Sequence, residues 1–122
     1  MTRAVLADDE PLMRDQLRAR LKELWPELEV VAEAKNGEEA IEQVEEHRPE
    51  VVFLDIRMPI MDGFGLLAEF ETLPDYIKNK AKVVMLSSSL DEQDNEKAKT
   101  YPQVVSFLVK PLSLDKLNSL PL

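Results

Sequence analysis

The chain has 122 residues, enough for one domain with a single hydrophobic core. Its 24 acidic and 15 basic residues give a net charge of −9, which argues against direct binding to nucleic acid, because phosphate binding needs a basic patch. With no cysteine and one histidine, the chain has no disulfide framework, thiolate metal site or histidine metal cluster. No stretch approaches the roughly 20 apolar residues that span a bilayer, and the N-terminus lacks a signal-peptide apolar stretch, so we expect a cytoplasmic protein without membrane contact.

Apolar runs alternate with helical patterns five times along the chain. The runs predict strands at residues 3–7, 29–34, 51–54, 82–86 and 104–109, and the helical patterns cover 11–25, 37–48, 63–72, 91–100 and 113–120. This alternation predicts an α/β fold: a doubly wound, five-stranded parallel sheet with helices on both faces. We find no repeat or linker, so residues 1–122 are expected to form a single domain.

Apolar spacing identifies the helix faces expected to be buried. In the first helix the spacings are four, four and three, and in the third they are three and three. The fourth helix is polar and has little to bury, so it is either weakly anchored and able to move or simply a solvated helix. The residues expected to be buried are Met13, Leu17, Leu21 and Leu24 in the first helix, Phe64, Leu67 and Phe70 in the third, and Leu90, Ala98 and Tyr101 around the fourth.

Polar groups gather where the predicted strands end. Asp55 ends the most apolar run of the chain, Asp8 and Asp9 follow the first strand, and Ser87 and Lys110 follow the fourth and fifth. In open α/β sheets this edge is where ligands bind. Each group alone has a plainer interpretation: the acidic residues can cap a helix, and the others can belong to ordinary turns and loops.

Taken together, these groups predict a phospho-acceptor site. Three carboxylates at one edge repel each other, and a divalent cation with oxygen ligands, for which Mg²⁺ is the natural candidate, removes that penalty. A strand-end carboxylate such as Asp55 can attack a phosphoryl group. Phosphoryl transfer mainly needs positioning and neutralisation of the oxygens, which Mg²⁺, Lys110 and the Ser87 hydroxyl would supply.

The chain resembles the receiver domain of bacterial two-component response regulators over essentially its whole length. The matching motifs are Ala7-Asp8-Asp9-Glu10, Leu54-Asp55-Ile56-Arg57-Met58-Pro59, Met61-Asp62-Gly63, Met85-Leu86-Ser87-Ser88 and Lys110-Pro111. The resemblance implies the flavodoxin-like (βα)5 receiver fold with strand order 2-1-3-4-5.

The resemblance also implies a role for each site residue. Asp55 would be the phosphorylated aspartate, and Asp8 and Asp9 would hold Mg²⁺ together with Asp55 and the backbone carbonyl of Arg57. Ser87 would be the switch hydroxyl, and Lys110 would contact the phosphate and carry a cis peptide bond to Pro111, which costs little before proline. Phe107 would be the switch aromatic, with a plain core position as the alternative.

By the same resemblance the chain is a signalling phosphoprotein, not an enzyme with an external substrate. A histidine kinase or phosphotransfer protein would phosphorylate Asp55, and the domain would catalyse only its own phosphorylation and dephosphorylation. The surface of the fourth helix, fifth strand and fifth helix would then change and control a protein partner or a missing effector domain.

Three other functions compete with this interpretation. An aspartyl-nucleophile phosphohydrolase normally has a second acidic residue two positions after the nucleophile, where this chain has Arg57. A flavodoxin-like cofactor binder needs a Ser/Thr/Gly-rich loop after the first strand, where this chain has Asp8-Asp9-Glu10. A degenerate receiver that acts as a phosphorylation-independent binding module is the third.

The output of the switch is left open by the sequence. No effector domain follows, so we expect either a stand-alone regulator or a receiver cut from a longer protein, with a weak homodimer as a further option. Residues 1 to about 70 resemble receivers of LytTR-type regulators, whereas residues from Leu73 onwards resemble single-domain regulators. A recombined or engineered chain is therefore another interpretation.

Overall fold

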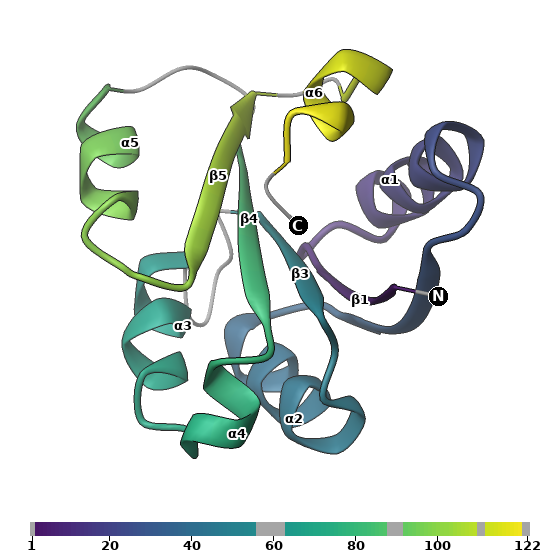
Figure 1. Ribbon diagram of the computed structural model, residues 1–122. Coiled ribbons are helices and arrows are strands. Elements are labelled where there is room, and N and C mark those ends of the chain that lie inside the picture. The colour runs from purple at the N-terminus through teal and green to yellow at the C-terminus, as the bar shows by residue number, and fades with distance from the viewer. Residues whose placement is uncertain (1, 56–62, 88–91, 110–111, 121–122) are drawn as a thin grey trace.

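The computed structural model describes residues 2–55, 63–87, 92–109 and 112–120. Five strands form one sheet in the order β2-β1-β3-β4-β5, and every neighbouring pair is parallel, as predicted. Figure 1 shows the strands at the centre with helices on either side. The elements are β1 (Arg3–Ala7), α1 (Pro11–Leu24), β2 (Glu29–Ala34), α2 (Gly37–His47), β3 (Val51–Asp55), α3 (Gly63–Phe70), α4 (Asp75–Lys78), β4 (Lys82–Ser87), α5 (Glu92–Ala98), β5 (Val104–Val109) and α6 (Leu114–Asn118).

The sheet divides the hydrophobic core into two clusters. Strand β3 contributes Val51 and Phe53 to the cluster under α1 and α6, and Val52 and Leu54 to the cluster under α2, α3, α4 and α5. All four residues are 0 % exposed. A strand covered on both faces needs apolar residues at every position, which is why β3 is the most apolar run of the chain.

Helix α1 begins at Pro11, whose fixed φ suits the first turn of a helix. Leu17 and Leu21 are buried as predicted, but Met13 is 37 % exposed, so its predicted burial is wrong. The side chain that reaches toward the sheet edge from this turn is its neighbour Arg14, which bonds to the backbone of the β1–α1 loop.

Helix α2 is held at both ends. The Asn36 side chain accepts a hydrogen bond from the Glu39 N–H (2.8 Å), and Arg48 closes the other end in the left-handed conformation with φ 47°. His47 is the last residue of α2, and its carbonyl accepts a hydrogen bond from Arg3 (2.7 Å).

The structure contains a short helix, α4, that the periodicity did not predict. Leu73 and Ile77, four residues apart, are 8 % and 4 % exposed and join the core cluster on that side of the sheet. The predicted fourth and fifth helices therefore correspond to α5 and α6, and both are shorter than expected. In the described residues, no helix is both long enough and apolar enough to cross a membrane.

Candidate functional site

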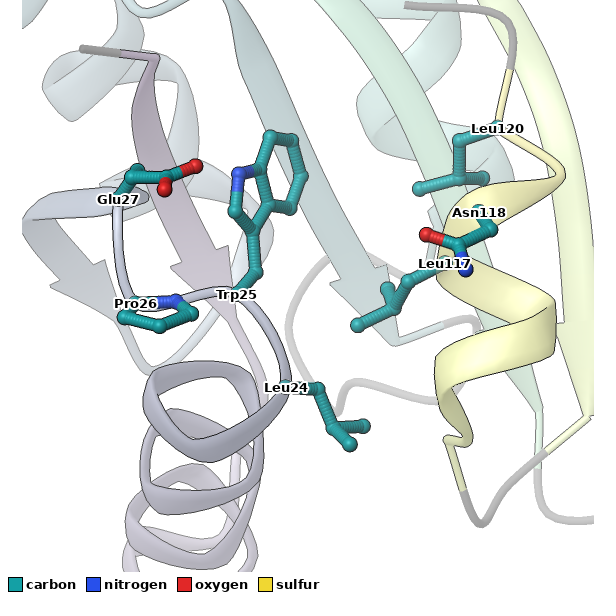
Figure 2. Close-up of a pocket in the computed structure, with 7 residues that line it drawn as sticks. All are labelled: Leu24, Trp25, Pro26, Glu27, Leu117, Asn118 and Leu120. Carbon is teal, nitrogen blue, oxygen red and sulfur yellow. The ribbon is translucent and has the colours of Figure 1, made fainter.

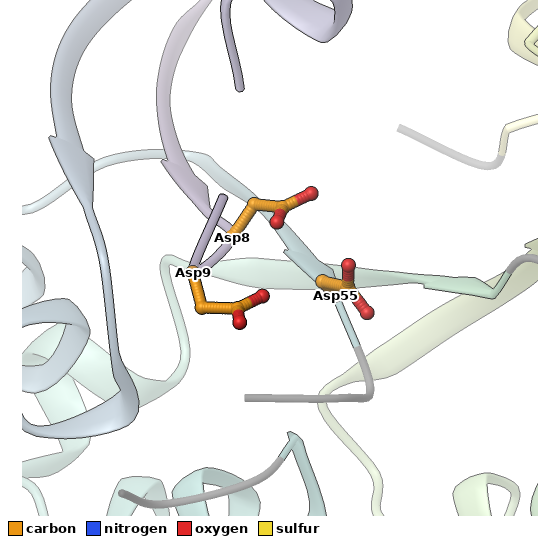
Figure 3. Close-up of side chains that lie close together, drawn as sticks. All are labelled: Asp8, Asp9 and Asp55. Atoms are coloured by element: carbon orange, nitrogen blue, oxygen red, sulfur yellow. The ribbon is translucent and has the colours of Figure 1, made fainter. Parts of the chain in front are cut away.

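Three carboxylates converge at the edge of the sheet, as predicted. Asp55 is the last residue of β3, and Asp8 and Asp9 directly follow the neighbouring β1, where Ala7 lies opposite Leu54. One ligand oxygen from each carboxylate lies within 4.8 Å of the others. Figure 3 shows the side chains of the two loop aspartates pointing toward the end of β3.

Asp8 is held in place by hydrogen bonds of both its backbone and its side chain. It is 1 % exposed, its N–H donates to the Ala34 carbonyl (3.0 Å), and its Oδ1 accepts from the Glu10 N–H (3.0 Å). Residue Glu10 is the N-cap of α1, and its side chain makes no capping hydrogen bond there. The capping alternative therefore does not account for the acidic run: the Asp8 carboxylate shapes the loop before the helix, beside two half-buried carboxylates.

Ser87 lies at the same edge of the sheet. It is the last residue of β4 and 2 % exposed, and its register partner is Val109 at the end of β5. Because Leu86 is the register partner of Asp55, Ser87 lies one residue beyond the level of that carboxylate. Lys110, Pro111 and Arg57, which the sequence assigned to the same site, lie outside the described residues.

Phe107 lies on β5 opposite Met85. Its ring is half-buried and packs against the core cluster under α3 and α5. This position agrees with the core alternative, and it also places the ring two residues before Val109, the partner of Ser87. A switch role for Phe107 stays a prediction.

Three residues near this edge are not among the predicted site residues. Arg14 of α1 donates from Nη1 to the Asp8 carbonyl (2.8 Å) and from Nε to Oε1 of Glu33 on β2 (3.3 Å). Arg18 pairs with the other oxygen of Glu33 at 2.7 Å. The one sequence signal for this group is a carboxylate inside the apolar run of β2.

The donor set defines what the site can bind. Carboxylate oxygens suit a hard cation, and Mg²⁺ accepts a few carboxylates as ligands while keeping several waters. The cluster of Asp8, Asp9 and Asp55 fits that requirement. Asp55 ends β3 at the edge of the sheet where ligands bind in open α/β folds.

A pocket of about 470 Å³ lies at the opposite end of α1, between that helix and α6 (Figure 2). It is lined by Leu24, Trp25, Pro26, Glu27, Leu117, Asn118 and Leu120. This lining has a single carboxylate and none of the three clustered aspartates. The pocket is therefore separate from the acidic site.

Comparisons with known proteins agree with this geometry. The chain is 45% identical over 116 residues to an uncharacterized response regulatory protein of Vibrio cholerae, a match that covers 95% of this chain and 42% of that protein. It is 34% identical to a protein-glutamate methylesterase/protein-glutamine glutaminase of Syntrophomonas wolfei, over 95% of this chain and 32% of that protein. The chain thus spans less than half the length of these two relatives.

A solved structure shares the fold. A CheX–CheY complex with BeF3 and Mg²⁺ from Borrelia burgdorferi contains a chain with a TM-score of 0.77 and 26% identity, covering 96% of this chain and 84% of that one. The response regulator receiver domain family matches residues 4–120 of the chain. With the parallel sheet in the order 2-1-3-4-5 and the acidic cluster at its edge, this match means that the chain belongs to the response regulator receiver family.

Proposed function

We propose that the chain is a phosphorylation-dependent switch in which Asp55 accepts the phosphoryl group. The observation that carries this proposal is the position of Asp55: it ends a fully buried strand, with ligand oxygens of Asp8 and Asp9 within 4.8 Å. A buried sheet does not gain stability from three adjacent carboxylates, so a charge requirement of the site explains them best.

In the proposed reaction, a carboxylate oxygen of Asp55 attacks the phosphorus of a phosphohistidine. The P–N bond breaks, its electron pair goes to the imidazole nitrogen, and an aspartyl phosphate forms. Asp8, Asp9 and Asp55, with the backbone carbonyl of Arg57, would hold Mg²⁺, which when bound offsets the charge on the phosphoryl oxygens. Dephosphorylation is the attack of water on the same phosphorus, with the Asp55 carboxylate as leaving group.

Two groups from the neighbouring strands complete the proposed site. Lys110 would bind one phosphoryl oxygen, and the Ser87 hydroxyl would donate a hydrogen bond to another. Ser87 is buried at the end of β4, so a movement of its side chain is felt by the packed residues around it. The cis bond before Pro111 belongs to the same proposal.

The response would travel from Ser87 to the α5–β5–α6 surface. Ser87 of β4 lies opposite Val109 of β5, and Phe107 lies two residues before Val109 on β5. Of the α5 side chains that the structure describes, Ala98 is buried, and Gln93, Glu96 and Lys97 are exposed. With one buried anchor among its described side chains, α5 is the element expected to shift when the site is phosphorylated.

The phosphoryl donor would be a histidine kinase or phosphotransfer protein in the cytoplasm. We propose that residues 1–122 are one receiver domain that binds neither nucleic acid nor membrane itself and acts through an attached domain or a protein partner. The separate resemblances of the two halves gain no support, because the Vibrio relative matches across both. The methylesterase relative is mostly sequence outside this domain, and the receiver itself would catalyse only its own phosphoryl chemistry.

The proposal is tested by incubating the chain with Mg²⁺ and acetyl phosphate and measuring its intact mass. We expect one phosphoryl adduct on the wild type and none on Asp55→Asn or in EDTA. Asp15→Asn, which changes an exposed residue of α1 by the same chemistry, should be modified like the wild type. No adduct from acetyl phosphate or from a phosphorylated kinase would instead indicate a binding module with an inactive site.

A further inference from the structure

We propose that Arg14 is a positioning residue of the metal site: it fixes the peptide between Asp8 and Asp9, and Glu33 holds Arg14 in place. The inference rests on the proposed function in one respect, namely that the acidic cluster binds Mg²⁺. The proposed role is indirect: no described contact joins the Arg14 side chain to the carboxylates of the metal ligands or to the phosphoryl group.

The first step of the argument is the peptide that Arg14 contacts. Its Nη1 donates to the Asp8 carbonyl at 2.8 Å, and that carbonyl belongs to the planar peptide joining Asp8 to Asp9. Fixing the plane sets the backbone direction on both sides of it. On its other side, Asp8 is held by its N–H bond to Ala34 (3.0 Å), so both peptides that flank Asp8 are anchored.

The second step is that the guanidinium is itself held. Its Nε lies 3.3 Å from Oε1 of Glu33, while Arg18 lies 2.7 Å from Oε2, so both carboxylate oxygens of Glu33 are engaged. The Arg14 and Glu33 side chains are 18% and 20% exposed. A rigid, planar fork can bridge a carboxylate and a carbonyl at once, which a lysine ammonium on a flexible stem does less well.

The third step concerns what Glu33 prevents. An arginine beside three carboxylates would otherwise pair with them, since charge-assisted hydrogen bonds to carboxylates are strong. Such a pair would occupy the oxygens that a cation needs. Because its Nε is bound to Glu33 and its Nη1 to the Asp8 carbonyl, Arg14 supports the backbone of the metal-site loop and does not occupy the carboxylate oxygens that a cation needs.

The positioning role and simple electrostatics predict opposite changes in Mg²⁺ affinity when Arg14 is removed. By charge alone, removing a positive group near a cation site strengthens cation binding. By positioning, the loop that carries Asp8 and Asp9 becomes free to rearrange, and binding weakens. Partners that orient metal ligands typically contribute about 10- to 100-fold to metal affinity.

The experiment measures Mg²⁺ affinity by following the backbone amide signals of the ¹⁵N-labelled chain during titration. We expect Arg14→Gln to weaken Mg²⁺ binding by about tenfold, at the lower end of that range because Arg14 contacts the backbone. Arg18→Gln is the matched control: it has the same charge change and the same partner, Glu33, but no described contact with Asp8. We expect its affinity to stay within about twofold of the wild type, because exposed charges are well screened.

Arg14→Lys separates charge from geometry and does not depend on how Arg14→Gln folds. It keeps the charge, so an unchanged affinity in this variant would overturn the proposal, as would tighter binding by Arg14→Gln. Equal weakening of Mg²⁺ binding in Arg14→Gln and Arg18→Gln would also overturn it. That result would be explained by the loss of any arginine paired with Glu33, and not by the contact between Arg14 and the Asp8 carbonyl. If the wild type itself binds no Mg²⁺, the proposed metal site fails and the inference fails with it; if the wild type binds and the variants match it, the inference alone fails.

Discussion

The acidic cluster should make the metal-free protein less stable than it would be with one carboxylate fewer. The ligand oxygens of the three aspartates lie within 4.8 Å of one another. At an effective dielectric constant of about 20, two unit charges at that separation repel by roughly 3.5 kcal/mol. Asp9 is half-buried, so water and salt screen part of this repulsion. We therefore expect Asp9→Asn to raise the free energy of unfolding in EDTA by about 1 to 2 kcal/mol.

Added Mg²⁺ should reverse this advantage. A ligand that binds only the folded state stabilises it by RT ln(1 + [L]/Kd), which is about 1.4 kcal/mol at ten times Kd. The wild type should gain this amount, whereas Asp9→Asn, with one carboxylate ligand fewer, should gain little at the same concentration. The difference between the two proteins should therefore shrink or change sign when Mg²⁺ is added.

The assay is urea unfolding in EDTA and in Mg²⁺, followed by the fluorescence of Trp25, the one tryptophan of the chain. With an m-value of about 1 to 3 kcal/mol/M, the expected change in EDTA moves the midpoint by roughly 0.3 to 2 M. The control is Glu42→Gln, which removes one negative charge from an exposed position of α2. If Asp9→Asn behaves like this control in EDTA, repulsion in the cluster is too small to matter. If it keeps the full gain from Mg²⁺, Asp9 is not a metal ligand.

Variants at three further positions test how the fold supports the site. Asn36→Ala removes the side chain that caps α2 through the Glu39 N–H and should cost about 1 kcal/mol in urea unfolding, whereas Asn36→Ser should recover most of it. Phe53→Ala empties a position that is 0 % exposed two residues before the end of β3; we expect a loss of about 3 to 5 kcal/mol, and a loss below 1 kcal/mol would contradict the packing. Lys116→Met removes the ammonium that donates to the Val109 carbonyl (2.6 Å) at the end of β5, and we expect a loss of about 1 kcal/mol and slower phosphorylation by acetyl phosphate.

The strands and the acidic cluster were predictable because their signals are local. A strand buried on both faces has a continuous apolar run, and the first polar residue after it marks the edge of the sheet. Asp8, Asp9 and Asp55 were placed together on that basis, and the structure confirms that they converge. The strand order itself came from resemblance, since the runs alone do not say which strands are neighbours.

Short or terminal helical segments were harder to predict. Helix α4 has four residues, and Ile77 is its one buried side chain, with the buried Leu73 just before it, which is too short a pattern to show a period. Met13 fits the apolar spacing of α1 but is exposed, because burial also depends on what the sheet offers opposite the first turn. Periodicity identifies the apolar face of a helix, and the tertiary structure decides how far along the helix that face is covered.

The Arg14–Glu33 pair depends on a feature of β2 that no local pattern indicates. Ala4 lies opposite Val30, but Val5 lies opposite Ala32, so Val31 is an extra residue in β2. If Val31 instead paired with Val5 in regular register, Glu33 would lie opposite Ala7 and point to the other face of the sheet, because a shift of one residue reverses the direction of every side chain that follows. With the extra residue, Glu33 lies opposite Leu6, on the face that α1 covers, within reach of Arg14 and Arg18. A bulge at one edge of the sheet thus determines which side chains support the loop that carries Asp8 and Asp9.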